Sequence, residues 1–146
     1  MKLIKYQLKS DEKLSSYEFI SEGPNGRIVK WIQFTPINQN EIYNLAFGDI
    51  SQVSVEIDDL IVSNNGDSEK VLSTVVSAVY AFCDKKPTAW IFVSGSTSSR
   101  TRLYQMGISK YLDYIKEDFF VYGMKEGEWE EFEIGKNYSS FLAQKK

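Results

Sequence analysis

Hydrophobic and polar positions change their spacing partway along the chain. Over residues 17–21, 28–34 and 42–48, apolar side chains alternate with polar ones. Alternation of this kind is typical of strands with one buried face. The Gly23-Pro24-Asn25-Gly26 segment between the first two predicts a tight turn, because Pro presets φ and Asn-Gly tolerates positive φ. This part of the sequence therefore predicts an antiparallel meander.

From about residue 68 the apolar positions recur every three or four residues. This spacing predicts two helices, over residues 68–84 and 98–114. Between them, Ala89-Trp90-Ile91-Phe92-Val93 is apolar without interruption, which is typical of a strand buried on both faces within a sheet. Residues 119–134 predict a strand hairpin, and residues 138–144 predict a short C-terminal helix.

The order of these elements predicts an α+β fold with a mixed, largely antiparallel sheet. The chain has 146 residues, of which 42% are hydrophobic and 14% aromatic. This length suits one domain over residues 1–146, and this composition excludes a disordered chain.

The inventory of reactive residues excludes several classes of enzyme and site. The chain contains no histidine and a single cysteine, Cys83. Nucleophile pairs of the Ser-His or Cys-His kind, the usual zinc sites and intrachain disulfides are therefore excluded, and no metal site is predicted. Because no G-x-x-x-x-G-K-[ST] segment is present, nucleotide hydrolysis is not supported either.

Charge and hydropathy bear on location and partners. The formal net charge is −3 and the pI is about 5.1, which argues against general attraction to nucleic acid. No secretory segment opens the sequence, and no apolar run reaches the roughly 20 residues that span a bilayer. We therefore expect a soluble, cytoplasmic protein without membrane contact.

The strongest functional signal follows the apolar segment 89–93. From Lys85 to Lys110 the chain carries five cationic residues and no acidic one. Small hydroxyl residues leading into a helix, with arginines in its first turn, are typical of an anion site. The candidate ligand-binding residues are Ser94, Gly95, Ser96, Thr97, Ser98, Arg100 and Arg102.

The two arginines of this segment have different expected positions. If the helix begins near Ser98, Arg100 and Arg102 project about 200° apart around its axis, so both cannot face one ligand. One arginine is expected to bind an anion, and the other to pair with an acidic side chain. A purely structural capping loop, with its arginine paired across the sheet, remains the alternative.

Several segments together resemble a family of short uncharacterised bacterial proteins along nearly the whole chain. This resemblance implies no activity. The segments are Tyr43-Asn44-Leu45-Ala46-Phe47-Gly48-Asp49, Ser63-Asn64-Asn65-Gly66-Asp67 with Lys70-Val71-Leu72, and Gly95-Ser96-Thr97 with Arg100-Thr101-Arg102-Leu103-Tyr104.

Residues 53–134 are also similar to the second half of the GNAT acetyltransferase fold in the order of their expected elements. Leu103-Tyr104 resembles the Leu-Tyr pair of that family, which implies Tyr104 as general acid, with Glu56 as base and an acyl-CoA such as acetyl-CoA as cofactor. The family's pyrophosphate loop is not matched at residues 63–68. Asp67 stands where the diphosphate would lie, which costs about 1 kcal/mol of repulsion at ~4 Å even in water.

The leading prediction is a non-catalytic binding or interaction module that uses no cofactor. It recognises an anionic group or a protein partner near Ser94 to Tyr104. The alternatives are an acyl-CoA-dependent N-acyltransferase of GNAT type and nucleic-acid contact through the basic stretch 85–110. The sequence leaves open whether the protein is an enzyme.

Overall fold

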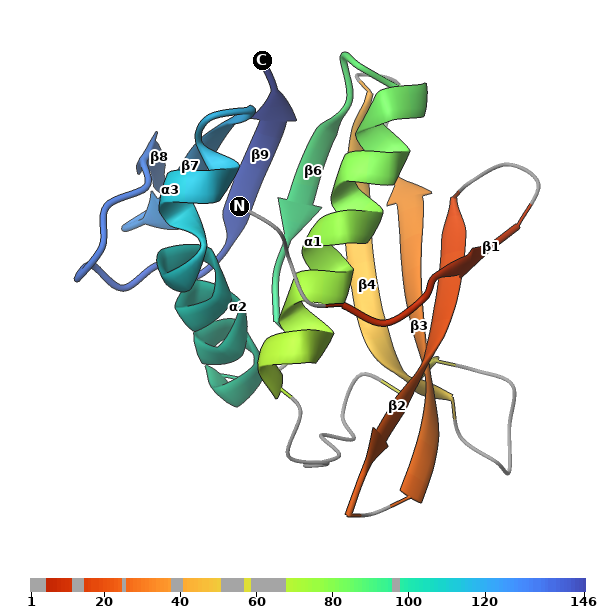
Figure 1. Ribbon diagram of the computed structural model, residues 1–146. Coiled ribbons are helices and arrows are strands. Elements are labelled where there is room, and N and C mark those ends of the chain that lie inside the picture. The colour runs from red at the N-terminus through yellow and green to blue at the C-terminus, as the bar shows by residue number, and fades with distance from the viewer. Residues whose placement is uncertain are drawn as a thin grey trace. The chain divides into compact units, whose positions relative to one another are not determined.

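The computed structural model describes residues 5–11, 15–24, 26–37, 41–50, 57–58, 68–95 and 98–146 (Figure 1). Its strands are β1 (Lys9–Ser10), β2 (Ser16–Gly23), β3 (Gly26–Pro36), β4 (Ile42–Ile50), β5 (Ile57–Asp58), β6 (Trp90–Val93), β7 (Phe119–Lys125), β8 (Glu128–Glu131) and β9 (Phe141–Lys145). Its helices are α1 (Ser68–Lys85), α2 (Ser98–Lys110) and α3 (Leu112–Ile115).

Backbone hydrogen bonds join the strands in the order β1-β2-β3-β4-β6-β9-β7-β8, and β5 pairs with β4 outside this path. The β4–β6 pair is parallel, with Tyr43 opposite Ile91. The pairs β1–β2, β2–β3, β4–β5, β6–β9, β7–β9 and β7–β8 are antiparallel. The predicted α+β class with a mixed, largely antiparallel sheet is therefore confirmed.

Contacts within the chain divide it into two compact units. One unit consists of Met1–Thr35 and Ala46–Lys86, and the other of Pro36–Leu45 and Pro87–Lys146. The first residues of β4 belong to the second unit and its last residues to the first. The assignment of one domain to residues 1–146 stays a prediction.

The core of the first unit lies between α1 and one face of the β2–β3 hairpin. Gly23 and Gly26 face each other at the hairpin turn, and Gly26 has a φ of +90°, as the Asn-Gly signal predicts. The ring of Phe34 stacks on that of Phe82, with 4.2 Å between centroids. Glu69 in the first turn of α1 and Lys85 in its last turn complement the helix dipole.

In the second unit, β6 has hydrogen-bonded neighbours on both edges, β4 and β9. Of its four residues only Ile91, at 1% exposed, is fully buried, whereas Trp90, Phe92 and Val93 are half-buried. Trp90 and Phe92 lie beside other aromatic rings, those of Tyr122 and Trp129, at 6.0 Å and 6.2 Å between centroids. The expectation of a strand buried on both faces was wrong. Its unbroken apolar run reflects a buried aliphatic face and an aromatic face.

The predicted C-terminal helix over residues 138–144 was also wrong, because the chain forms strand β9 there. Strand β9 lies between β6 and β7, and its Ala143 is opposite both Ile91 and Val121 (Figure 1). Leu, Ala and Gln favour a helix locally, but so short a helix has little stability of its own. Pairing with two strands satisfies the backbone on both sides instead.

The two main helices are close to their predicted bounds. Helix α1 ends one residue later than expected, and the predicted helix 98–114 is interrupted at Tyr111 between α2 and α3. The Tyr111 N–H still donates to the Gly107 carbonyl at 3.1 Å, so the helical path continues almost unbroken through the interruption.

Replacement of Ile91 tests the buried face of β6. We expect Ile91→Ala to lower the free energy of unfolding by about 2–5 kcal/mol, since it leaves a cavity in a packed site. Ile134→Ala is the matched control, because Ile134 is 65% exposed and its loss should change stability by less than about 0.5 kcal/mol. Urea unfolding measures both, and equal losses would contradict the assignment of Ile91 to the core.

Candidate functional site

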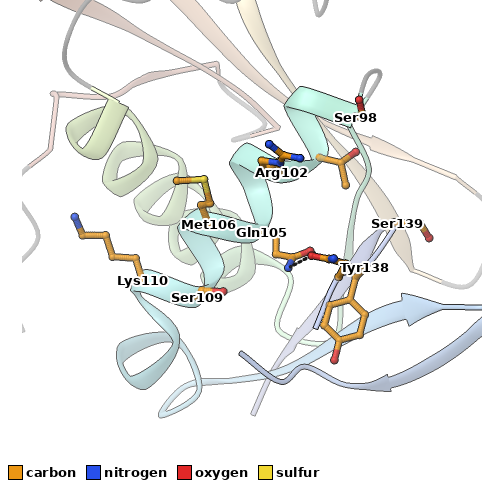
Figure 2. Close-up of a pocket in the computed structure, with 10 residues that line it drawn as sticks. Ser98, Arg102, Gln105, Met106, Ser109, Lys110, Tyr138 and Ser139 are labelled. Atoms are coloured by element: carbon orange, nitrogen blue, oxygen red, sulfur yellow. Dashed lines mark hydrogen bonds between the residues drawn. The ribbon is translucent and has the colours of Figure 1, made fainter. Parts of the chain in front are cut away.

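A groove of about 880 Å³ lies in the second unit between α2 and the segment that leads into β9 (Figure 2). It is lined by Ser98, Thr101, Arg102, Gln105, Met106, Ser109, Lys110, Asn137, Tyr138 and Ser139. Its walls carry two cationic side chains, several hydroxyl and amide groups and one methionine. None of these ten residues is acidic.

One face of α2 forms the first wall. Steps of three or four residues along α2 connect Ser98, Arg102, Gln105 and Ser109, and Thr101 precedes Gln105 by four residues. This spacing places them on the same side of the helix. Arg100 is on another side and is only 3% exposed, whereas Arg102 is exposed. The prediction that the two arginines point to different sides of the helix agrees with this difference in burial.

The side-chain amide of Gln105 fixes the second wall. Its Nε2 donates a hydrogen bond to the Lys136 carbonyl at 2.6 Å, and its Oε1 accepts one from the Tyr138 N–H at 3.0 Å. Figure 2 shows Gln105 turned toward Tyr138, with Arg102, Met106 and Lys110 following one another along α2. Gln105 thus holds the segment 136–138 against the middle of the helix.

Tyr138 anchors this segment from its other side. The ring covers Gly123 of β7, where a Cβ atom would overlap it, so glycine is required at that position. The hydroxyl donates to Glu130 Oε2 at 3.1 Å and accepts a hydrogen bond from the Glu133 N–H at 3.1 Å. Burial raises the pKa of the Tyr138 phenol above its ordinary value, so this hydroxyl stays protonated.

Lys136 neutralises part of the acidic stretch next to the groove. Its Nζ lies 2.8 Å from Glu133 Oε2 and 3.0 Å from Glu130 Oε2. The hydrogen bonds to Glu133 and Glu130 raise the pKa of Lys136, and the one to Glu133 has the larger effect. In turn, the hydrogen bond from Lys136 lowers the pKa of Glu130. Lys136 does not line the groove, and the cationic side chains among the lining residues are Arg102 and Lys110.

The model of DUF6934, a family of unknown function, matches residues 2–146. The chain belongs to DUF6934. The match covers nearly the whole chain, as the resemblance to an uncharacterised family implied, and it carries no activity. No curated protein and no solved structure matches the chain.

Two of the predicted ligand-binding residues of this DUF6934 chain, Ser98 and Arg102, line the groove. Ser94 is exposed, and Gly95 packs so closely on the Thr101 backbone nitrogen that a Cβ atom would clash. Close packing against the start of α2 therefore explains the glycine at this position.

The other predicted site residues lie elsewhere. Arg100 is buried, and Tyr104 is 7% exposed and does not line the groove. Ser96, Thr97 and Glu56 lie outside the described residues, as does the segment 63–67. Among the described residues, the groove on the exposed face of α2 includes Ser98 and Arg102 of the predicted site, and the assignment of a ligand to the loop after β6 stays a prediction.

Sequence reasoning missed most of the groove. Gln105, Met106, Ser109 and Lys110 could have been found by extending the polar face of α2 in steps of three and four residues. The wall at residues 137–139 had no such signal, since its place beside α2 depends on the return of the chain through β9.

In the part of the chain that the structure describes, His, Cys, Asp and Glu side chains form no group of three that could hold a metal ion. None of the described helices combines the length and the apolar character needed to cross a bilayer.

Two buried tyrosines provide a test of the groove wall. Tyr138→Phe removes both hydroxyl hydrogen bonds and should lower the free energy of unfolding by about 1–3 kcal/mol. Tyr17 is the matched control, because its buried hydroxyl has no hydrogen-bond partner among the described residues. We expect Tyr17→Phe to leave stability within about 0.5 kcal/mol or to raise it.

Urea unfolding measures both effects, and equal effects of the two substitutions would contradict the hydrogen bonds assigned to Tyr138. Alkaline titration adds a check on Tyr17, since burial raises the pKa of its phenol to about 12. A phenol whose pKa is raised in the folded state stabilises the fold at pH values below its unfolded-state pKa. This contribution is lost as the pH rises through the folded-state pKa. A phenol that ionises at a pH of about 12 should therefore be missing in Tyr17→Phe.

Proposed function

We propose that this DUF6934 protein is a cytoplasmic, non-catalytic binding module whose groove receives an anionic group of a small ligand or of a protein partner. The observation that carries the proposal is the composition of the groove. Arg102 and Lys110 line it together with the hydroxyls of Ser98, Thr101, Ser109 and Ser139, and no lining residue is acidic. Guanidinium, ammonium and hydroxyl groups are typical hydrogen-bond donors to carboxylates and phosphates.

The electrostatics of α2 support an anion at this site. Ser98 and Arg102 lie at the N-terminal end of the helix, where the dipole and the unsatisfied N–H groups favour negative charge. At the other end of α2 the dipole is negative and disfavours an anion, so the positive charge there comes from Lys110 alone. The residues that line the groove include two cations and no acid, in a chain whose net charge is −3.

The groove has little with which to catalyse a reaction. Its lining contains no carboxylate and no cysteine, and the Tyr138 hydroxyl is engaged with Glu130 and Glu133. General acid–base catalysis needs a group within hydrogen-bond reach of the substrate that can exchange a proton near neutral pH. Arginine and lysine side chains are ordinarily cations near that pH and not proton exchangers, which suits binding.

An acyltransferase of GNAT type is the second candidate. Its support is the order of the elements over residues 53–134, where β5, α1, β6, α2, β7 and β8 follow one another, with the short helix α3 before β7. For this candidate Tyr104 has to reach the substrate, yet it is only 7% exposed. Nucleic-acid contact has less support, because Arg100 is buried and only Arg102 and Lys110 of the basic stretch line the groove.

The proposed function is tested by neutralising each arginine in turn. The probes are inorganic phosphate, tripolyphosphate and poly-L-glutamate, and the readout is thermal unfolding. We expect a probe at 100 times its Kd to stabilise the wild type by about 2.7 kcal/mol. Arg102→Met should abolish that shift while changing stability by less than about 0.5 kcal/mol.

Arg100→Met is the contrasting variant, because a buried guanidinium is kept only where it is compensated. It should cost about 3–5 kcal/mol of stability and leave the probe-induced shift in place. No stabilisation of the wild type by any probe would overturn the proposal. Micromolar binding of acetyl-CoA in calorimetry, lost in Tyr104→Phe, would favour the acyltransferase instead.

A further inference from the structure

Three side chains follow one another along the rim of the groove on α2. Arg102, Met106 and Lys110 are each four residues apart and all line the groove (Figure 2). At about 1.5 Å of rise per residue, Met106 lies about 6 Å along the helix from each cation, and the cations are about 12 Å apart. The rim therefore presents a cation, an apolar group and a second cation at even spacing.

Met106 is the apolar member of this series and is 61% exposed. A flexible, polarisable methionine on a surface is typical of sites that contact varied apolar partners. A single phosphate or carboxylate could contact one of the cations, but it is too small to reach Met106 and the second cation, about 12 Å further along the helix, as well.

We infer that the groove binds an extended acidic segment of a partner protein, in which an apolar residue stands between two acidic ones in the pattern acidic-x-apolar-x-acidic. The inference rests on the proposed function and names its partner. In an extended chain, side chains i, i+2 and i+4 point to the same side and rise by about 3.3 Å per residue. Their spacing of about 6.6 Å and about 13 Å matches the rim of α2.

The size and chemistry of the groove favour a peptide over a nucleotide. A volume of about 880 Å³ is at the upper end of the range for ligand sites, which suits an extended ligand. A nucleotide would add a base, whose usual partner is an exposed aromatic face. Tyr138 is the one aromatic residue that lines the groove, and its ring is packed on Gly123.

A second copy of this chain is a poorer partner. Two stretches of the chain have the pattern, residues 18–22 and 113–117. The first is held in β2, where Glu18 and Glu22 pair with Trp31 and Arg27 of β3. The second begins in α3, where helical geometry does not give the extended spacing.

The test is fluorescence anisotropy of labelled peptides with the full chain. The matching peptide is Gly-Glu-Ser-Leu-Ser-Glu-Gly. One control replaces Leu by Ser, a second replaces both Glu by Gln, and a third, Gly-Glu-Leu-Ser-Glu-Gly, has the acids one residue closer together. We expect the matching peptide to bind at least about tenfold more tightly than each control, since each control loses at least one well-placed contact.

Protein variants assign the contacts. Arg102→Met and Lys110→Met should each weaken the matching peptide about tenfold or more, whereas Lys85→Met, a loss of the same charge on α1, should not. Met106→Ser should remove the preference for Leu over Ser while the dependence on the two Glu residues remains. This last variant distinguishes the series on the rim from a general basic surface.

The outcomes separate this inference from the proposed function. If tripolyphosphate binds in an Arg102-dependent way and the peptides do not differ, the groove binds anions and the peptide inference is overturned. If neither kind of probe binds, both are overturned. A dimer that the matching peptide dissociates, seen by sedimentation, would replace the partner protein by a second copy of the chain.

Discussion

The hydrogen bonds of the Gln105 side-chain amide join the two walls of the groove. One end of this amide binds the Lys136 carbonyl and the other the Tyr138 N–H, which the chain presents just before β9 begins. Both bonds are partly buried, and a backbone group there without a partner costs free energy, so the two bonds favour the position of the segment 136–138 against α2. The exposed face of α2 becomes a groove only because this segment lies beside it.

The same arrangement explains the distribution of charge. The stretch 126–133 is rich in acidic residues and is close in sequence to a groove proposed to bind anions. Glu130 and Glu133 are held by Lys136, and Glu130 also accepts from the Tyr138 hydroxyl, whose ring lies over Gly123. These contacts engage carboxylates that lie outside the groove lining. The residues that line the groove are cationic or neutral.

Much of the fold could be predicted from local pattern. The spacing of apolar residues was enough for α1 and α2, and the Asn-Gly turn for the β2–β3 hairpin. Strand β9 was not predictable in this way, because its residues favour a helix locally and its pairing partners, β6 and β7, come from distant parts of the sequence. For the same reason only one wall of the groove could be predicted. Helical geometry distinguished Arg102 from Arg100 on α2, but the wall at 137–139 depends on β9.

The account predicts that the groove exists in solution because Gln105 holds Tyr138, and hydrogen exchange of the Tyr138 amide tests this most directly. Since this N–H donates to Gln105 Oε1 at 3.0 Å, we expect it to exchange far more slowly than an unstructured amide in the wild type. In Gln105→Ala the protection of Tyr138 should be lost, while that of Ile91 in β6 is kept. A Tyr138 amide that exchanges at the unprotected rate in the wild type, or equally slowly in both proteins, would contradict the account.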